Sequence, residues 1–118
     1  MTTTLVRRSD IELRHFHESG VFLGDGIARP MSDTMSAGWA RYEPGAANPW
    51  LVDYDEVITV IEGSFTIESD GDLLTASPGD LLFLRKGTEL VYRSDEGALI
   101  VYVAYPQWEE AAKAAGRI

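Results

Sequence analysis

The stretch NPWLVDYDEVITVIEG, residues 48 to 63, decides the fold predicted for this chain. Side chains along a strand repeat every two residues, so an extended segment over residues 50–60 would place six side chains on one face. These six are Trp50, Val52, Tyr54, Glu56, Ile58 and Val60. A carboxylate on such an apolar face needs a hydrogen-bond donor, and burial would raise its pKa. The stretch therefore predicts a strand that carries one acidic side chain among apolar ones.

Short apolar or alternating runs separated by turns fill the middle of the chain, which is typical of an all-β barrel or sandwich. The runs cover residues 33–43, 56–63, 64–70, 72–77, 80–87, 89–94 and 98–105. They are rich in β-branched and aromatic residues, and turn pairs such as Asp70-Gly71 and Pro78-Gly79 lie between them. We therefore expect an all-β fold with short connections.

The two ends of the chain differ from this strand-rich middle. Residues 9–16 are a possible strand, and residues 20–30 are predicted to form a glycine-rich connection. In the tail, Pro106 can open a helix and Gly116 can close it. We expect one domain over residues 1–118, with an N-terminal strand and loop (1–30), a barrel core (31–105) and a C-terminal helix (106–118).

The composition narrows the class of protein. A chain of 118 residues with 45% hydrophobic side chains has the size and core of a single globular domain. It has no cysteine, which suits a reducing compartment, and no apolar run resembles a signal peptide or a membrane span, so we expect a cytoplasmic protein without a membrane partner. A net charge of -9 with scattered basic residues argues against nucleic acid as a partner.

Glycines and acidic residues recur at a characteristic spacing between residues 45 and 90. They are Gly45, Glu56 and Gly63 in a first group and Gly79, Asp80 and Gly87 in a second. With these residues the segment resembles the two sequence motifs of the cupin superfamily. The resemblance implies a double-stranded β-helix, a jelly-roll-like barrel closed here by a short C-terminal helix. It also implies that the face carrying Glu56 turns inward.

Cupins usually bind a metal through three histidines and a glutamate, and the resemblance places only the glutamate here, at Glu56. The histidine positions fall on Trp50, Val52 and Leu90. Because these side chains cannot coordinate a metal, we expect no tightly bound catalytic metal and no cofactor. Two weak metal sites stay open: Glu56 alone, and the pair His15 and His17, whose separation puts both imidazoles on one strand face.

A closer resemblance covers roughly residues 31 to 108. The matching residues are Pro49, Trp50, Tyr54, Asp55, Glu56, Tyr102, Pro106 and Trp108. With them the chain resembles the cupin domain of EutQ, the ethanolamine-utilization protein, which also lacks the histidines. The resemblance implies a small acyl or phosphoryl substrate, because EutQ-like proteins are associated with acetate kinase activity. By analogy with the cupin family we also expect a homodimer.

The candidate site residues follow from strand parity. Glu56 and Tyr54 form the candidate catalytic pair, with Tyr54 as the donor that meets the carboxylate. The candidate ligand-binding residues are Trp39, Arg41, Trp50, Tyr92 and Tyr102. Among them, Arg41 is the cation best placed for an anionic ligand if its face of the strand turns inward.

We therefore expect a barrel that binds a small polar or anionic metabolite, with metal-free acid–base chemistry by Glu56 and Tyr54. Three alternatives stay open. The first is acetate-kinase-like phosphoryl transfer, in which a nucleotide would be held by Arg41, Arg85 and Lys86 with magnesium on Glu56. The second is a metal-dependent oxygenase or isomerase, and the third is a non-catalytic sensor or assembly protein. The sequence identifies neither the ligand nor whether the protein is an enzyme.

Overall fold

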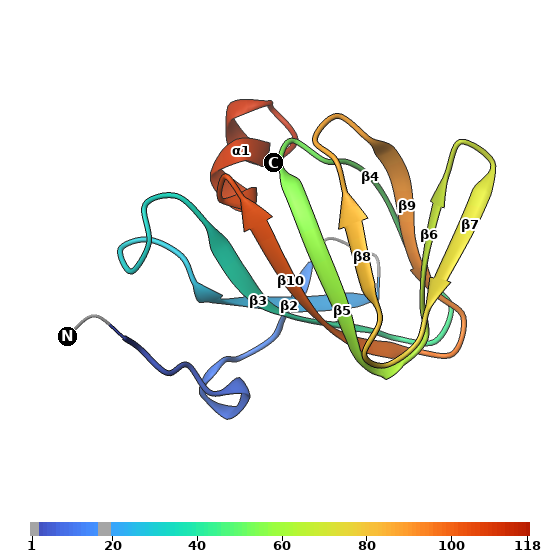
Figure 1. Cartoon of the computed structure of the whole chain (residues 1–118), viewed down its shortest axis with the longest axis horizontal. Helices are drawn as coiled ribbons and strands as arrows, with labels where there is room; N and C mark the ends of the chain where they lie inside the picture. Colours follow the sequence, from blue (N-terminus) through green and yellow to red (C-terminus); the bar gives the residue numbers. More distant parts are fainter. Residues whose placement is uncertain (1–2, 17–19) are drawn as a thin grey trace.

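The computed structural model describes residues 3–16 and 20–118, which form mainly antiparallel strands (Figure 1). The strands are β1 (Arg14–Phe16), β2 (Val21–Ile27), β3 (Ser36–Tyr42), β4 (Ala46–Leu51), β5 (Asp55–Gly63), β6 (Phe65–Ser69), β7 (Asp72–Ala76), β8 (Leu81–Leu84), β9 (Glu89–Ser94) and β10 (Ala98–Tyr105). The 3-10 helix η1 (Arg8–Asp10) precedes β1, and helix α1 (Trp108–Ala114) follows β10.

The strands form two sheets that pack face to face, as Figure 1 shows. One sheet has six strands in the order β1-β2-β3-β10-β5-β8, and the other has four in the order β4-β9-β6-β7. Every pairing among the described residues is antiparallel. This arrangement confirms the all-β barrel with a short C-terminal helix that the sequence predicts.

Strand β10 lies in the middle of the larger sheet and sets the register of the barrel interior. Tyr102 on β10 lies opposite Gly38 on β3 and Ile58 on β5. A Cβ atom added at Gly38 would lie 2.2 Å from the carbonyl oxygen of Gly24 and 2.7 Å from the Tyr102 hydroxyl. Glycine at position 38 therefore lets strands β2 and β3 approach closely while the tyrosine hydroxyl passes beside them.

Strand β2 was not predicted from the sequence, and the single strand expected over residues 48–63 is divided between β4 and β5, which lie in different sheets. The segment expected to be a glycine-rich connection forms β2, where a Cβ at Gly24 would lie 2.6 Å from the carbonyl oxygen of Glu12. Strand β4 contains Pro49, which is tolerated because β4 is the edge strand of the smaller sheet. In the N-terminal region, the possible strand over residues 9–16 is reduced to the three residues of β1.

Helix α1 is joined to the barrel by its first residues and by the chain that follows it. The backbone N–H of Trp108 donates a 3.1 Å hydrogen bond to the hydroxyl of Ser36, and the indole of Trp108 is buried. Beyond the helix, the guanidinium of Arg117 pairs with the carboxylate of Asp53 at 3.1 Å. These contacts hold the C-terminal segment against the end of the barrel where β4 leads into β5.

Candidate functional site

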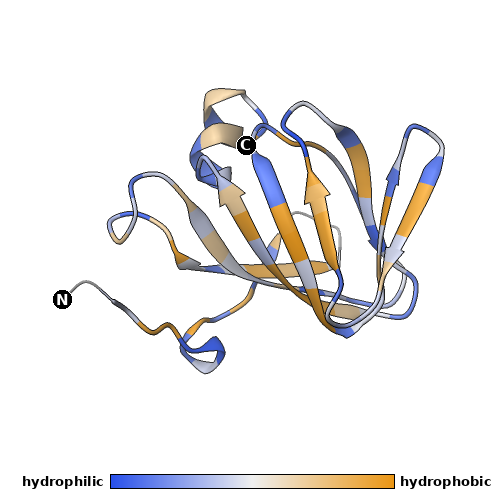
Figure 2. Ribbon diagram, in the orientation of Figure 1, coloured by the Kyte–Doolittle hydropathy of each residue, from blue (hydrophilic) through white to orange (hydrophobic). Residues whose placement is uncertain are grey.

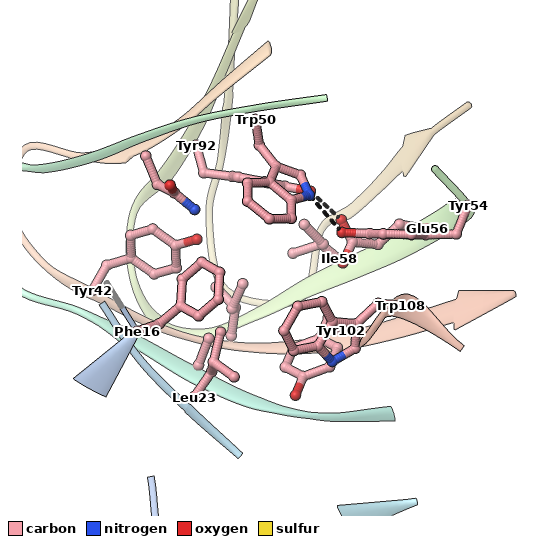
Figure 3. Close-up of a pocket in the computed structure, with 13 residues that line it drawn as sticks. Phe16, Leu23, Tyr42, Trp50, Tyr54, Glu56, Ile58, Tyr92, Tyr102 and Trp108 are labelled. Carbon is pink, nitrogen blue, oxygen red and sulfur yellow. Dashed lines mark hydrogen bonds between the residues drawn. The ribbon is translucent and has the colours of Figure 1, made fainter. Parts of the chain in front are cut away.

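An apolar cavity of about 50 Å³ lies inside the barrel, between the two sheets (Figure 3). One water molecule needs roughly 10–15 Å³ of such room, so the cavity can take a few waters or a ligand with few non-hydrogen atoms. Its walls are mostly aromatic and aliphatic. They consist of Phe16, Leu23, Ala40, Tyr42, Asn48, Trp50, Tyr54, Glu56, Ile58, Tyr92, Ile100, Tyr102 and Trp108.

Glu56 is the acidic residue of this cavity. Its position on β5 places it on the inward face with Ile58, and only 6% of its surface is exposed. The hydroxyl of Tyr92 donates a 2.7 Å hydrogen bond to Oε1 of Glu56. Burial raises the pKa of Glu56 to about 7, and the bond from Tyr92 opposes this rise. Within residues 3–16 and 20–118, Oε2 has no hydrogen-bond partner. No fully buried side-chain polar atom of these residues lacks a partner, so Oε2 must have accessible surface. Because Glu56 lines the cavity, we take Oε2 to be open to it.

Tyr54 is close to Glu56 but is not its donor, which corrects the prediction from the sequence. The Tyr54 hydroxyl accepts a 3.0 Å hydrogen bond from Nε1 of Trp50, and the donor to Glu56 is Tyr92 on β9. Burial, followed by the negative charge of Glu56, raises the pKa of Tyr54. Tyr54 therefore stays protonated at neutral pH and forms part of the cavity wall with Trp50.

Tyr102 lines the cavity with its ring, while its hydroxyl points away from Glu56 (Figure 3). That hydroxyl donates a 2.5 Å hydrogen bond to Oδ1 of Asp25 on β2, and Nε1 of Trp108 donates to the same oxygen at 2.9 Å. Burial raises the pKa of Asp25, although both hydrogen bonds act in the opposite direction. Asp25 thus fixes two aromatic walls of the cavity from behind.

Asp25 is a site residue that the sequence reasoning missed. The sequence analysis expects residues 20–30, which include Asp25, to form a glycine-rich connection. Had the segment been recognised as a strand, alternation from Leu23, which lines the cavity, would have placed Asp25 on the same face two residues later.

Trp39 and Arg41 lie on the outer face of β3, so the condition for their candidate ligand-binding role, an inward-facing strand face, is not met. Ala40 and Tyr42 occupy the inward positions of that strand and are buried, whereas Arg41 is exposed. The guanidinium of Arg41 stacks over the ring of Phe22 at 5.4 Å. The structure therefore brings Trp50, Tyr92 and Tyr102 together around Glu56 but leaves Trp39 and Arg41 outside the cavity.

The comparison with known proteins places the chain in a family. The family model described as ethanolamine utilisation protein EutQ matches residues 17–110. The chain belongs to the EutQ family. The proteins named acetate kinase EutQ from Salmonella typhimurium and Escherichia coli are 30% and 31% identical to it over 90 residues, which is 75% of this chain. The chain spans only 39% and 38% of the length of these two EutQ relatives.

Solved structures of the EutQ family have the same fold. The crystal structure of an ethanolamine utilization protein Q from Salmonella typhimurium superposes with a TM-score of 0.83 at 26% identity, covering 89% of this chain and 87% of that one. The Clostridium difficile EutQ protein gives 0.73 at 28% identity, with coverage of 89% and 77%. An RmlC-like cupin from Shewanella frigidimarina gives 0.74 at 17% identity, with coverage of 86% and 89%, and shows the cupin fold alone.

In this EutQ-family chain the residues at the usual cupin metal site do not fit a metal. The three sequence positions at which cupins carry histidines hold Trp50, Val52 and Leu90, an indole and two alkyl groups, none of which coordinates a metal ion. No group of three or more His, Cys, Asp or Glu side chains gathers elsewhere in the described residues. Of the histidine pair, His15 stacks on Phe22 at 5.0 Å, and His17 lies outside the described residues.

Across residues 3–16 and 20–118 there is no helix long and apolar enough to cross a membrane. The cytoplasmic location expected for this EutQ-family protein stays a prediction.

Proposed function

We propose that this EutQ-family cupin binds a small polar metabolite in its barrel cavity and uses Glu56 for acid–base chemistry that needs no metal. The observation that carries the proposal is the carboxylate of Glu56, buried in an apolar cavity with Oε1 bound by Tyr92 and Oε2 open. A polar side chain whose second oxygen faces an apolar cavity is suited to meet a ligand donor.

The chemistry follows from the surroundings of Glu56. An acid or base works best when its pKa lies near the working pH, and burial raises the pKa of Glu56 to about 7. The Tyr92 hydroxyl fixes the carboxylate through Oε1, so that Oε2 can take a proton from a bound ligand or return it. Trp50 and Tyr54, joined by their hydrogen bond, hold the adjoining wall in place.

Tryptophan fluorescence offers a direct test of binding. Trp50 and Trp108 line the cavity, whereas Trp39, the third tryptophan of the sequence, lies outside it. In a Trp39→Phe variant the tryptophan emission comes only from Trp50 and Trp108. We expect small polar metabolites to change this emission in a saturable way. The same titration in Glu56→Gln should show weakened binding. Quenching that never saturates, or that is identical in Glu56→Gln, contradicts the proposal.

Turnover separates an enzyme from a sensor or assembly protein once a ligand is known. Conversion of that ligand by the wild type, lost in Glu56→Gln, supports acid–base catalysis. Binding without conversion supports the non-catalytic alternative.

Phosphoryl transfer is the second candidate, because the curated relatives are named acetate kinase EutQ. A transferred phosphoryl group needs cationic partners. Among the described residues that line the cavity there is no Lys or Arg: the guanidinium of Arg85 stacks over Phe83, and the backbone N–H of Lys86 bonds to Asp55. We therefore rank this activity second. ATP formation from acetyl phosphate, ADP and magnesium, abolished by Glu56→Gln, would place it first.

A role in ethanolamine utilisation and a homodimeric state complete the proposal. The first rests on the description of the family. The second is supported by an apolar patch on the outer face of the larger sheet, formed by Val57 and Ile61 of β5 with Leu81 and Phe83 of the edge strand β8. Figure 2 shows β8 as a continuously hydrophobic strand. Exposed apolar patches beside an open sheet edge often mark contacts between chains.

A further inference from the structure

The described residues that line the cavity can give it a charge of zero or a negative charge. The titratable side chains facing Glu56 are tyrosines from several elements: Tyr54 before β5, Tyr42 on β3, Tyr92 on β9 and Tyr102 on β10. Burial raises the pKa of all four phenols, so they are neutral near pH 7. The lining residues that the structure describes include no basic side chain. Among these described lining residues, an anionic ligand would thus find no cation.

The walls of the cavity add a second preference. Phe16 meets Trp50 edge to face at 5.6 Å and Trp108 at 5.7 Å, so three rings pack together beside the tyrosines. Figure 3 shows these rings around one space with Glu56 at its edge. The π face of an aromatic ring carries partial negative charge and attracts ammonium groups.

We infer that the ligand of this cavity is a small organic cation, such as a primary ammonium compound, whose charged group binds Oε2 of Glu56 and packs against the aromatic rings. The inference rests on the proposed binding function and specifies its ligand class. It differs from the polar or anionic ligand expected from the sequence, because Arg41, the cation that would have met an anion, lies on the outer face of β3.

Binding of a cation has a consequence for protons. The ligand attracts the ionised carboxylate, so saturation should lower the pKa of Glu56 and release a proton from the fraction of molecules that carried one. Protonated Glu56 carries no charge to attract the cation. The affinity for the cation should therefore rise as pH increases through the pKa of Glu56, which is about 7. An anionic ligand would give the opposite sign for both quantities.

Three two-carbon probes of similar size separate the ligand classes: ethylammonium, ethanol and acetate. We would titrate each into the wild-type protein and follow the NMR signals of the cavity residues. Glu56→Gln, which is nearly isosteric, removes the charge, and Glu62→Gln makes the same change at an exposed position of the same strand. We expect ethylammonium to bind about tenfold or more tightly than either other probe, to lose about tenfold or more of its affinity in Glu56→Gln, and to keep it in Glu62→Gln.

The outcomes separate this inference from the proposed function. If ethanol or acetate binds in the cavity more tightly than ethylammonium and depends on Glu56, the binding function stands and the cation inference is wrong. If none of the probes saturates the cavity signals, both are wrong. Should Glu56→Gln fail to fold, the order of the three probes and the pH dependence in the wild type still decide the question.

Discussion

The hydroxyl of Tyr92 donates a 2.7 Å hydrogen bond to Oε1 of Glu56 and so joins β9 of the smaller sheet to β5 of the larger one across the barrel interior. The bond stabilises the ionised carboxylate and opposes the effect of burial on its pKa.

Replacement of Tyr92 by Phe should therefore raise the pKa of Glu56 further, because the carboxylate loses its donor while its burial is kept. An NMR titration of the Glu56 side-chain carbon measures the change. Tyr105→Phe, at an exposed position at the end of β10, is the matched control and should leave the pKa of Glu56 unchanged. An unchanged or lowered value in Tyr92→Phe would show that this bond does not act on Glu56.

The stability of the protein should fall as pH rises between the unfolded and folded pKa values of Glu56. The folded pKa is about 7 and the ordinary value is 4.5, so the folded state holds the proton more tightly over this window. The unfolded state then binds fewer protons, and the free energy of unfolding contributed by Glu56 decreases with increasing pH.

Glu56→Gln removes this pH dependence. Between about pH 4.5 and about pH 8, the free energy of unfolding of Glu56→Gln should therefore rise relative to that of the wild type by on the order of 1–3 kcal/mol. Urea unfolding at several pH values measures it, with Glu62→Gln as the control that should follow the wild type. A constant difference between Glu56→Gln and the wild type over this range contradicts a raised pKa.

Asp25 should contribute to stability through its two donors. In Asp25→Ala the Tyr102 hydroxyl and the Trp108 indole lose a shared acceptor, and we expect a loss of about 2–3 kcal/mol in the free energy of unfolding. The emission of Trp108 should also change. Asp72→Ala, at an exposed position on β7, should cost much less. Equal losses in the two variants would mean that Asp25 does not anchor these rings.

The proposed dimer can be tested at the outer-face patch. A charge at Leu81, which is 72% exposed on β8, should separate the chains if this face is buried between them. Light scattering should show a dimer for the wild type and a monomer for Leu81→Glu. Leu73→Glu changes a similarly exposed leucine, 60% exposed on β7, and should remain dimeric. A monomeric wild type removes the dimer from the account.

The strands that sequence analysis predicted are those in which the hydrophobic pattern has period two, and β9 and β10 are found over residues 89–94 and 98–105 as expected. Strand β2 was missed because Gly24 lies in a glycine-rich stretch, and the division of residues 48–63 into β4 and β5 was missed because alternation continues through Pro49. Both residues are tolerated for tertiary reasons, the close approach of Glu12 and an unpaired sheet edge, that no local pattern contains.

The candidate site was predicted in part for the same reason. Alternation along one extended strand put Glu56, Tyr54 and Trp50 on the same face. All three line the cavity, but Trp50 lies on β4 of one sheet and Glu56 on β5 of the other. Alternation could not reveal which tyrosine donates to Glu56, since Tyr92 is 36 residues away and reaches it only because the two sheets face each other. For Trp39 and Arg41, alternation alone left open which face of β3 turns inward, and the buried side chain of Tyr42 decides it.

The most direct test of the central claim is the pKa of Glu56, measured by NMR in the free protein and in protein saturated with ethylammonium. The account predicts a value near 7 in the free protein, as burial in the cavity requires, and a lower value when the cation is bound. A value near the ordinary 4.5 that does not change with ligand would contradict both the buried carboxylate and its role in binding.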